Sequence, residues 1–313
     1  MRWKYLFGPV ASRRLGRSLG VDIIPAKTCP FDCVYCEVGR TTRRTKERAS
    51  YVQPDEVLSE LEGFFDGGGQ ADYVTFSGSG EPTLSRDLGR LIRETKKRFG
   101  VNVAVITNGA LLGDPEVRAE LAEADVVMPS LDSAREESFE AVNRPLAGLG
   151  VREVIEGLVK FTKEFRGRAW LEVLLVTGVN DSDRDIEALA KAIERIRPER
   201  VQLNTVIRPP AEKDALPASR EKLEEVAARL SRCAPTEIVA PAALKKAKSA
   251  AMDREEAVVE TLRRRPCTAE DLASGLSIGE GELSEILDVL LCRGLIEKAR
   301  FGQGEFYQAA GRR

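Results

Sequence analysis

The sequence contains no histidine among its 313 residues. Without an imidazole, the chain cannot use a Ser/His or Cys/His catalytic pair, and it cannot offer nitrogen ligands to a zinc ion. Aromatic residues are also scarce, at 6%. Any chemistry must therefore depend on cysteine, carboxylates, hydroxyls, amines or a cofactor.

The chain also lacks net charge and long apolar runs. Its 48 basic and 50 acidic residues leave a formal charge of −2, which argues against a generally basic nucleic-acid or membrane-surface binder. No stretch approaches the roughly 20 apolar residues of a membrane helix, and the start, MRWKYLFGPV, does not resemble a secretory signal. We therefore expect a cytoplasmic protein without membrane contact, in which clustered cysteines bind metal or catalyse rather than form disulfides.

Short β-branched runs alternate with longer amphipathic segments, and this alternation predicts an α/β fold with a parallel sheet. The expected strands are residues 20–24, 73–77, 102–107, 125–130, 169–177 and 200–206. The expected helices are residues 54–65, 85–99, 115–124, 148–165, 183–196 and 219–232. Six such units are too few for a complete eight-unit barrel, so a partial barrel and a doubly wound sheet both remain open. Either fold gathers functional groups at the carboxyl ends of the strands.

A change of composition near residue 234 indicates a domain boundary. We expect a core domain at 1–235, a linker at 236–252 and a small domain at 253–313. Helical patterns at 253–264, 268–274 and 281–293 precede a strand, a glycine-centred turn and a second strand, an order typical of a winged helix-turn-helix. DNA binding is not expected, because the would-be recognition helix is acidic. Packing, substrate docking or dimerisation are the alternative roles.

Cys29, Cys33 and Cys36 lie directly after the first expected strand, in KTCPFDCVYCEVG. A loop with this spacing can direct three thiolates to one point, and soft thiolates select iron–sulfur clusters, zinc or copper(I). Three ligands leave one iron of a [4Fe–4S] cluster without a protein ligand, whereas zinc needs a fourth ligand that no histidine supplies. The remaining cysteines are far apart and fit small buried hydrophobic positions: Cys233, Cys267 and Cys292.

The Cys-x3-Cys-x2-Cys spacing, with Tyr35 before the third cysteine, resembles the signature of the radical S-adenosylmethionine (radical SAM) superfamily. The resemblance extends over roughly residues 20–210, through FSGSGEPTL, ITNG, PSLDS, LVTGVNDS and QLNTVIRPP. It implies a partial (β/α)6 barrel of the TIM type, to which the small winged-helix domain is added. GPVASRRLGRSLG and VNRPL are most similar to a poorly characterised branch of iron–sulfur oxidoreductases that is often grouped with wyosine-forming tRNA enzymes.

The resemblance further implies a [4Fe–4S] cluster on the three cysteines, with SAM bound to the remaining iron. The glycine-rich segment would hold the methionine amino group, since its glycines let backbone approach a ligand and Glu81 offers a carboxylate. Hydroxyls at strand ends would bind a carboxylate or ribose. The expected SAM-binding residues are Tyr35, Gly78, Gly80, Glu81, Thr107, Asn108, Ser130, Asp132, Val179 and Asn180.

Polar residues also interrupt the last expected strand. Gln202 and Asn204 are two residues apart, so they share one face, and Arg208 follows just beyond. We expect this face to point into the barrel lumen, where Glu172 joins it. The alternatives are a paired structural carboxylate at Glu172 and satisfied core polar groups at the other two positions.

A basic segment, GRTTRRTKER, follows the third cysteine, and further arginines precede the first expected strand. A solvated loop is one interpretation. The functional interpretation is a docking surface for phosphate, carboxylate, RNA, a protein substrate or an acidic electron donor such as ferredoxin or flavodoxin. The residues concerned are Arg40, Arg43, Arg44, Lys46 and Arg48, with Arg13, Arg14 and Arg17.

The resemblance therefore implies an enzyme that cleaves SAM reductively to methionine and a 5′-deoxyadenosyl radical, which abstracts a substrate hydrogen atom. A tRNA or another phosphate-bearing molecule is the leading substrate candidate. Two other functions stay open. One is a maturase that docks a partner protein through the C-terminal domain. The other is a regulator whose cluster senses redox state or iron while that domain binds nucleic acid.

Overall fold

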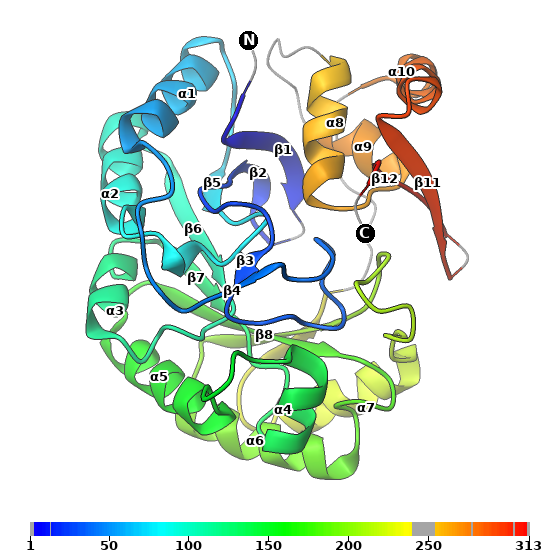
Figure 1. The fold of residues 1–313 in the computed structure, drawn as a ribbon. Coiled ribbons are helices and arrows are strands. Elements are labelled where there is room, and N and C mark those ends of the chain that lie inside the picture. The colour runs from blue at the N-terminus through cyan, green and yellow to red at the C-terminus, as the bar shows by residue number, and fades with distance from the viewer. Residues whose placement is uncertain (1–2, 13, 240–253, 277, 303, 312–313) are drawn as a thin grey trace.

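The computed structural model describes residues 3–12, 14–239, 254–276, 278–302 and 304–311, and its centre is a curved sheet with helices on the outer side (Figure 1). Six strands run parallel in chain order, and each is followed by a helix, as the sequence predicts. The strands are β2 (Gly16–Val21), β5 (Tyr73–Phe76), β6 (Asn102–Thr107), β7 (Val126–Pro129), β8 (Arg168–Leu175) and β9 (Arg200–Thr205). The helices are α1 (Pro54–Asp66), α2 (Leu88–Phe99), α3 (Pro115–Leu121), α5 (Val151–Glu164), α6 (Asp183–Ile196) and α7 (Arg220–Leu230). This is an α/β fold with a mainly parallel sheet, consistent with a partial barrel.

Amphipathic spacing explains how the outer helices pack. In α6, Ile186, Leu189 and Ile193 recur at helical spacing and are fully buried against the sheet. The helix begins after Ser182, whose hydroxyl accepts a hydrogen bond from a backbone N–H of the first turn. None of the described helices combines the length and apolar character needed to cross a membrane.

Two edge strands extend the sheet beyond the predicted core. β1 (Leu6–Ser12) pairs antiparallel with β2, and β10 (Thr236–Ile238) pairs parallel with β9. Pairing with β1 moves the start of β2 to Gly16, so the expected strand at 20–24 is corrected to 16–21. The expected linker at 236–252 is also corrected at its start, because residues 236–238 form β10. Residues 240–252 of that linker lie outside the described part of the chain.

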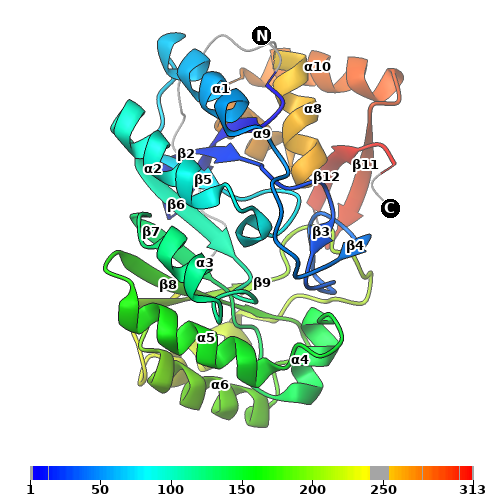
Figure 2. The same cartoon turned by 60° about the vertical axis from the view of Figure 1, so that its left-hand side comes forward.

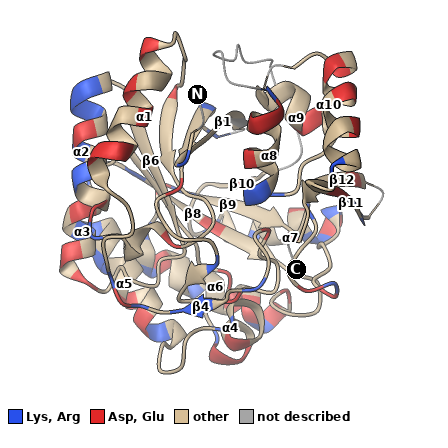
Figure 3. Ribbon diagram, turned by 45° about the horizontal axis from the view of Figure 1, so that its top comes forward, with Lys and Arg blue, Asp and Glu red and all other residues tan. Residues whose placement is uncertain are grey.

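The C-terminal unit has the element order predicted from the sequence. Its helices α8 (Arg254–Arg264), α9 (Ala269–Leu276) and α10 (Glu280–Cys292) precede the antiparallel hairpin of β11 (Ile296–Phe301) and β12 (Gly304–Ala309). The unit buries a hydrophobic core of its own, and α8 and α9 pack on β1 at the open side of the barrel (Figure 1). Acidic residues occur along α10, which carries no Lys or Arg (Figure 3).

A buried ion pair joins the C-terminal unit to the barrel. The Nε atom of Arg264, at the end of α8, lies 3.2 Å from the Oδ2 atom of Asp22, and both side chains are less than a tenth exposed. The Arg264 guanidinium also stacks over the ring of Phe7 in β1, 4.9 Å from its centroid. These contacts fix α8 against the first two strands.

None of the six cysteines forms a disulfide, and the structure describes all of them. Cys267 is buried in the core of the C-terminal unit, as predicted. The same prediction is wrong for Cys292, which is exposed because it lies at the outer end of α10, and Cys233 is only partly buried.

Candidate functional site

The three clustered cysteines lie in a loop held by two short strands, β3 (Thr28–Cys29) and β4 (Arg43–Arg44), at the end of the barrel toward which the β6 arrow points (Figure 2). Burial raises the pKa of the Cys29 and Cys33 thiols, and negative charge on Cys36 raises both further. The three sulfur atoms are therefore close enough to repel one another as thiolates. A bound cationic metal group would supply the charge that offsets this repulsion.

Two asparagine side chains reach the sulfur atoms from other elements. The Nδ2 atom of Asn108, after β6, lies 3.2 Å from Cys29 Sγ. The Nδ2 atom of Asn143, at the end of α4 (Glu136–Asn143), lies 3.4 Å from Cys33 Sγ. Amide hydrogen bonds to sulfur are the contacts that surround thiolate-ligated metal centres.

The cysteine loop fits an iron–sulfur cluster better than a single metal ion. Within the described residues, no group of three or more His, Cys, Asp or Glu side chains is arranged to hold a metal ion. In a cluster each cysteine binds a different iron, so the sulfur atoms stand farther apart than around a single ion. The donor set, three thiolates without a fourth protein ligand, therefore matches a [4Fe–4S] cluster.

The glycine-rich segment after β5 packs directly on the cysteine loop. A Cβ at Gly80 would lie 2.3 Å from Ile24 Cγ2 and 2.5 Å from the Thr28 carbonyl oxygen. At Gly78 the backbone has φ of +143°, and a Cβ there would lie 2.4 Å from the Asp22 carboxyl carbon. Gly80 is thus required by its close approach to the backbone at Thr28, next to Cys29, whereas Gly78 is required by its positive φ and by the nearby Asp22 side chain.

Glu81 is buried, and protein donors occupy both of its carboxylate oxygens. Its Oε1 atom accepts hydrogen bonds from Thr107 Oγ1 at 2.6 Å and from Thr83 Oγ1 at 2.7 Å, and its Oε2 atom accepts one from Asn108 N at 2.8 Å. Burial raises the pKa of this carboxyl, and the hydrogen bonds oppose that rise. Glu81 therefore joins the glycine-rich segment to the β6 loop, a role that the sequence did not predict.

A second buried carboxylate, Asp132, organises the loop after β7. Its Oδ2 atom accepts hydrogen bonds from Tyr35 OH at 2.5 Å and from Asn143 Nδ2 at 2.7 Å, and its Oδ1 atom accepts one from Leu174 N at 2.9 Å. Burial raises the pKa of Asp132 as well. Asp132 thus ties the cysteine loop, α4 and β8 together.

The side chain of Asn180, one of the expected SAM-binding residues, is held by backbone groups of the protein. Asn180 is fully buried, its Nδ2 atom donates to the carbonyls of Asp132 and Leu174 at 2.8 Å, and its Oδ1 atom accepts from Val176 N at 2.8 Å. Because the amide has no remaining contact to offer, Asn180 is a structural residue of this loop. Ser130 and Val179 remain partly exposed beside it.

The structure thus joins Glu81 to Thr107 and Asn108, and Asn108 and Asp132 to residues of the cysteine loop. It also adds Asn143, which the sequence reasoning did not single out. The only sequence signal for it is its place in VNRPL, a segment noted for similarity but given no chemical role. Its distance of 110 residues from Cys33 hid the contact.

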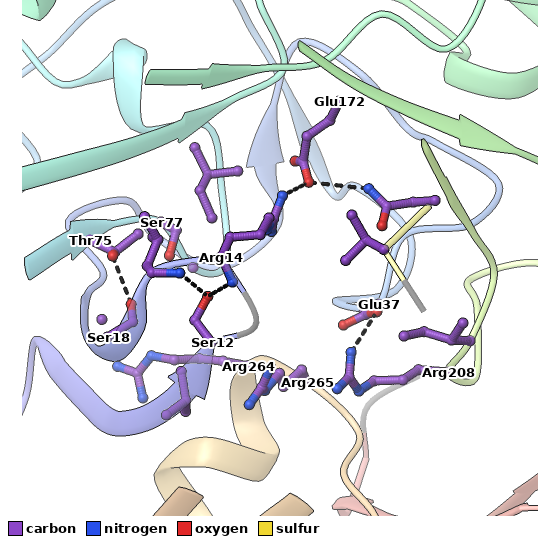
Figure 4. A pocket seen from close by; sticks show the side chains of 18 of the residues that line it. Ser12, Arg14, Ser18, Glu37, Thr75, Ser77, Glu172, Arg208, Arg264 and Arg265 are labelled. Atoms are coloured by element: carbon purple, nitrogen blue, oxygen red, sulfur yellow. Dashed lines mark hydrogen bonds and ion pairs between the residues drawn. The ribbon is translucent and has the colours of Figure 1, made fainter. Parts of the chain in front are cut away.

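A cavity of about 390 Å³ lies inside the barrel, between the strands and the C-terminal unit (Figure 4). We call it the lumen cavity. Gly78 and Glu172 line it from the barrel, while Arg264, Arg265 and Asp271 line it from the C-terminal unit. Its size suits a small molecule, and Gly78 connects it to the glycine-rich segment.

Glu172, Asn204 and Arg208 line this cavity as predicted, whereas Gln202 does not. Arg14, which follows β1, forms an ion pair with Glu172, and its Nη1 atom lies 2.8 Å from Gln202 Oε1 (Figure 4). Asn204 Nδ2 lies 3.3 Å from Glu172 Oε1. Glu172 is thus both a lumen residue and a paired carboxylate, and Gln202 is a fully buried, satisfied polar group.

The basic residues after the third cysteine differ in their contacts with the rest of the protein. Arg48 is 7% exposed, donates to the carbonyls of Thr83 and Ser85 at 3.0 Å and pairs with Glu120. It is therefore a structural residue, which corrects its expected place on a docking surface. Arg40 and Arg44 pair with Asp32, whereas Arg43 and Lys46 are exposed; Arg13 lies outside the described residues.

Comparison with known proteins supports the cluster interpretation. The family model described as the radical SAM superfamily matches residues 23–197. A UPF0026 protein of Helicobacter pylori (strain J99) is 32% identical over 307 residues, which cover 97% of each chain. A protein of Brachyspira hyodysenteriae named GTPase Obg is 36% identical over 299 residues, which cover 95% of this chain but only 44% of that protein.

Among solved structures, Streptococcus suis SuiB bound to S-adenosylmethionine has a similar fold. The match has a TM-score of 0.54 and 13% identity, and it covers 71% of this chain and 50% of SuiB. At this identity the likeness concerns the fold alone. The matched family segment, residues 23–197, includes the three-cysteine loop. The chain belongs to the radical SAM superfamily, whose members are enzymes that bind a [4Fe–4S] cluster and S-adenosylmethionine.

Proposed function

We propose that this chain is a radical SAM enzyme in which Cys29, Cys33 and Cys36 hold the cluster and the lumen cavity holds the substrate. The observation that carries the proposal is the set of three partly buried cysteines, which repel one another as thiolates and whose surroundings offer amide donors to Cys29 and Cys33. When bound, the cluster and SAM supply an electron and a 5′-deoxyadenosyl radical that removes a hydrogen atom from the substrate. The protein then has to hold the cofactors beside the cavity and fix the substrate.

The described residues can perform these tasks without a catalytic base. Asn108 and Asn143 donate to cysteine sulfur, which stabilises negative charge on the ligands. Glu81 and Asp132 anchor the surrounding loops through buried hydrogen bonds. A rigid arrangement of this kind keeps the reacting groups in fixed positions.

For SAM itself, we propose that the segment from Gly78 to Glu81 forms the cradle, with Thr107, Asn108, Ser130, Asp132 and Val179 around it. Gly78 lines the lumen cavity, so a ligand on this segment would lie next to a substrate in the cavity. Tyr35 stays in the set through its hydrogen bond to Asp132. We leave the side chain of Asn180 out of the set because the protein backbone satisfies it.

We further propose that the C-terminal unit is a winged helix-turn-helix that closes the substrate cavity. Arg264, Arg265 and Asp271 of this unit line the cavity, which supports a role in substrate binding. Its α10 would be the recognition helix of a DNA-binding module, but its acidic surface opposes contact with phosphates. This favours the enzyme over the regulatory function.

Anaerobic reconstitution tests the proposed function. The wild-type chain should bind about four irons and form 5′-deoxyadenosine from SAM and dithionite. Cys33→Ala should abolish both properties, whereas Cys292→Ala should change neither, because Cys292 is exposed at the end of α10 in the C-terminal unit. Retention of SAM cleavage by Cys33→Ala, or failure of the reconstituted wild type to bind iron, would overturn the proposal.

A further inference from the structure

The arginines of the lumen cavity differ in how far the protein satisfies them. Arg14 pairs with Glu172, and Arg264 pairs with Asp22 and Glu260. Among the residues that the structure describes, the Arg265 guanidinium has neither a hydrogen-bond nor an ion-pair partner, and its Nε atom is shielded from solvent. A buried cationic donor without an acceptor is energetically unfavourable. Arg265 therefore needs a hydrogen-bond acceptor that the protein does not supply.

A second unsatisfied donor faces the same cavity. The terminal nitrogens of Arg208 lie 3.2 Å from Glu37 and 3.4 Å from Asp271, which hold the side chain in place, but its Nε atom is buried and has no hydrogen-bond partner. Arg208 follows β9 in the barrel, while Arg265 follows α8 in the C-terminal unit. Figure 4 shows the two side chains side by side at one wall of the cavity.

Two guanidinium groups with unsatisfied N–H donors match an oxyanion. The fork of N–H groups on arginine fits the oxygen atoms of a carboxylate or a phosphate, and burial strengthens such charge-assisted hydrogen bonds. The cavity volume of about 390 Å³ accommodates a small molecule that carries such a group. Glu172 and Asn204 also line the cavity, where Arg14 neutralises the Glu172 carboxylate.

We infer that the lumen cavity binds a small-molecule substrate through a phosphate or carboxylate group, which Arg265 and Arg208 hold. The inference rests on the proposed function, because it assigns the cavity to the substrate of the radical reaction. It also gives the C-terminal unit a defined role: it supplies one of the two anion-binding arginines. The substrate site is then incomplete without that unit.

Isothermal titration of the reconstituted full-length enzyme tests this inference, with inorganic phosphate and succinate as separate probes. At least one of the two anions should bind saturably. Binding of phosphate would indicate recognition of a phosphate group, and binding of succinate would indicate recognition of a carboxylate. Arg265→Gln should weaken that binding about ten-fold or more. Arg293→Gln is the matched control, since Arg293 is an exposed arginine of the same unit that does not line the cavity, and it should bind like the wild type.

Binding of neither anion, or unchanged binding in Arg265→Gln, would overturn the inference. A measurement on the wild type avoids dependence on how the variant folds: the bound anion should slow the modification of Arg265 by phenylglyoxal, read by mass spectrometry, but not that of Arg293. Equal protection of both arginines, or of neither, contradicts the inference. SAM cleavage measured on the same preparation separates the two proposals. Cleavage without anion binding refutes only the anion-binding inference. Anion binding without cleavage refutes only the proposed function.

Discussion

The side-chain nitrogen of Asn108 lies 3.2 Å from the sulfur of Cys29, although 79 residues separate them in the sequence. The Oδ1 atom of the same side chain accepts a hydrogen bond from Ala110 N at 2.9 Å, which fixes the direction of the amide. A donor to a ligand sulfur stabilises negative charge, and a cluster gains negative charge when it is reduced. The contact therefore favours the reduced cluster.

Replacing Asn108 with alanine should lower the reduction potential of the reconstituted cluster. A one-electron potential changes by about 59 mV for a tenfold change in equilibrium constant, so we expect a fall of some tens of millivolts. A redox titration followed by electron paramagnetic resonance measures it. Asn102→Ala, at the exposed start of β6, the strand that precedes Asn108, is the control and should leave the potential unchanged. An unchanged or raised potential in Asn108→Ala would contradict the assigned contact.

Replacing Gly80 with alanine should disturb the cysteine loop. The new Cβ would lie 2.5 Å from the Thr28 carbonyl oxygen, and backbone atoms next to Cys29 cannot yield without moving that ligand. We expect a loss of about 1–3 kcal/mol in the free energy of unfolding, and a lower iron content after reconstitution. Denaturant unfolding and iron analysis measure the two effects.

Gly113→Ala is the matched control for this prediction, because a Cβ at Gly113 meets no atom within 4 Å. That variant should keep its iron and its stability. If Gly80→Ala bound iron as well as Gly113→Ala, the close packing of the glycine-rich segment on the cysteine loop would not matter for the site.

The sequence predicted the parallel core because its helices and strands have clear periodicity, as in α6. It did not predict β1, because LFGPVAS contains a glycine and a proline and shows no alternation of polar and apolar residues. β10 is only three residues long and was assigned to the linker. Each strand forms by pairing with the edge of the parallel core, β1 with β2 and β10 with β9, and local propensity does not record such pairing.

In the candidate site as well, the sequence revealed local motifs but not contacts between distant segments. Close spacing in the chain revealed Cys29, Cys33 and Cys36, and the glycine-rich segment was visible as a motif. Contacts between distant segments were not visible, so Asn143 was missed and the buried amide of Asn180 was assigned to a ligand. Arg48 was grouped with a basic surface because charge in a sequence does not show burial.

The exposed residues Arg43 and Lys46 should matter for electron delivery by a protein donor. We propose that an acidic donor of the ferredoxin or flavodoxin type docks on this part of the cysteine loop, since opposite charges accelerate association. The double variant Arg43→Glu with Lys46→Glu should cleave SAM about tenfold more slowly with flavodoxin as the reductant, because like charges oppose docking. Assays at rising salt should weaken the difference.

Dithionite is the control for this prediction, because a small reductant does not need the docking surface. The double variant and the wild type should cleave SAM at the same rate with dithionite. Equal rates with flavodoxin as well would remove these residues from the docking surface, and a slower rate with dithionite would show that the variant damages the site itself.

The buried pair of Asp22 and Arg264 should make the effect of an Arg264 substitution depend on pH. Burial raises the pKa of Asp22 above its usual value, and the nearby Arg264 cation limits that rise. Arg264→Met removes the cation, so the folded-state pKa of Asp22 rises further. The range of pH in which Asp22 holds its proton in the folded state but loses it in the unfolded state therefore becomes wider. An acid with a raised folded-state pKa loses stability as the pH rises through that range.

The stability loss in Arg264→Met should therefore be smallest near pH 4 and should grow toward neutral pH, to about 3–5 kcal/mol for a broken buried pair. Urea unfolding across this range measures it against the wild type. Arg263→Met, an exposed neighbour on α8, should show a small loss. In an Asp22→Asn background, the pH-dependent part of the Arg264→Met effect should disappear, since the introduced amide does not titrate. A loss that kept the same pH dependence in that background would assign the effect to another carboxyl near Arg264, such as Glu260, which also forms an ion pair with it.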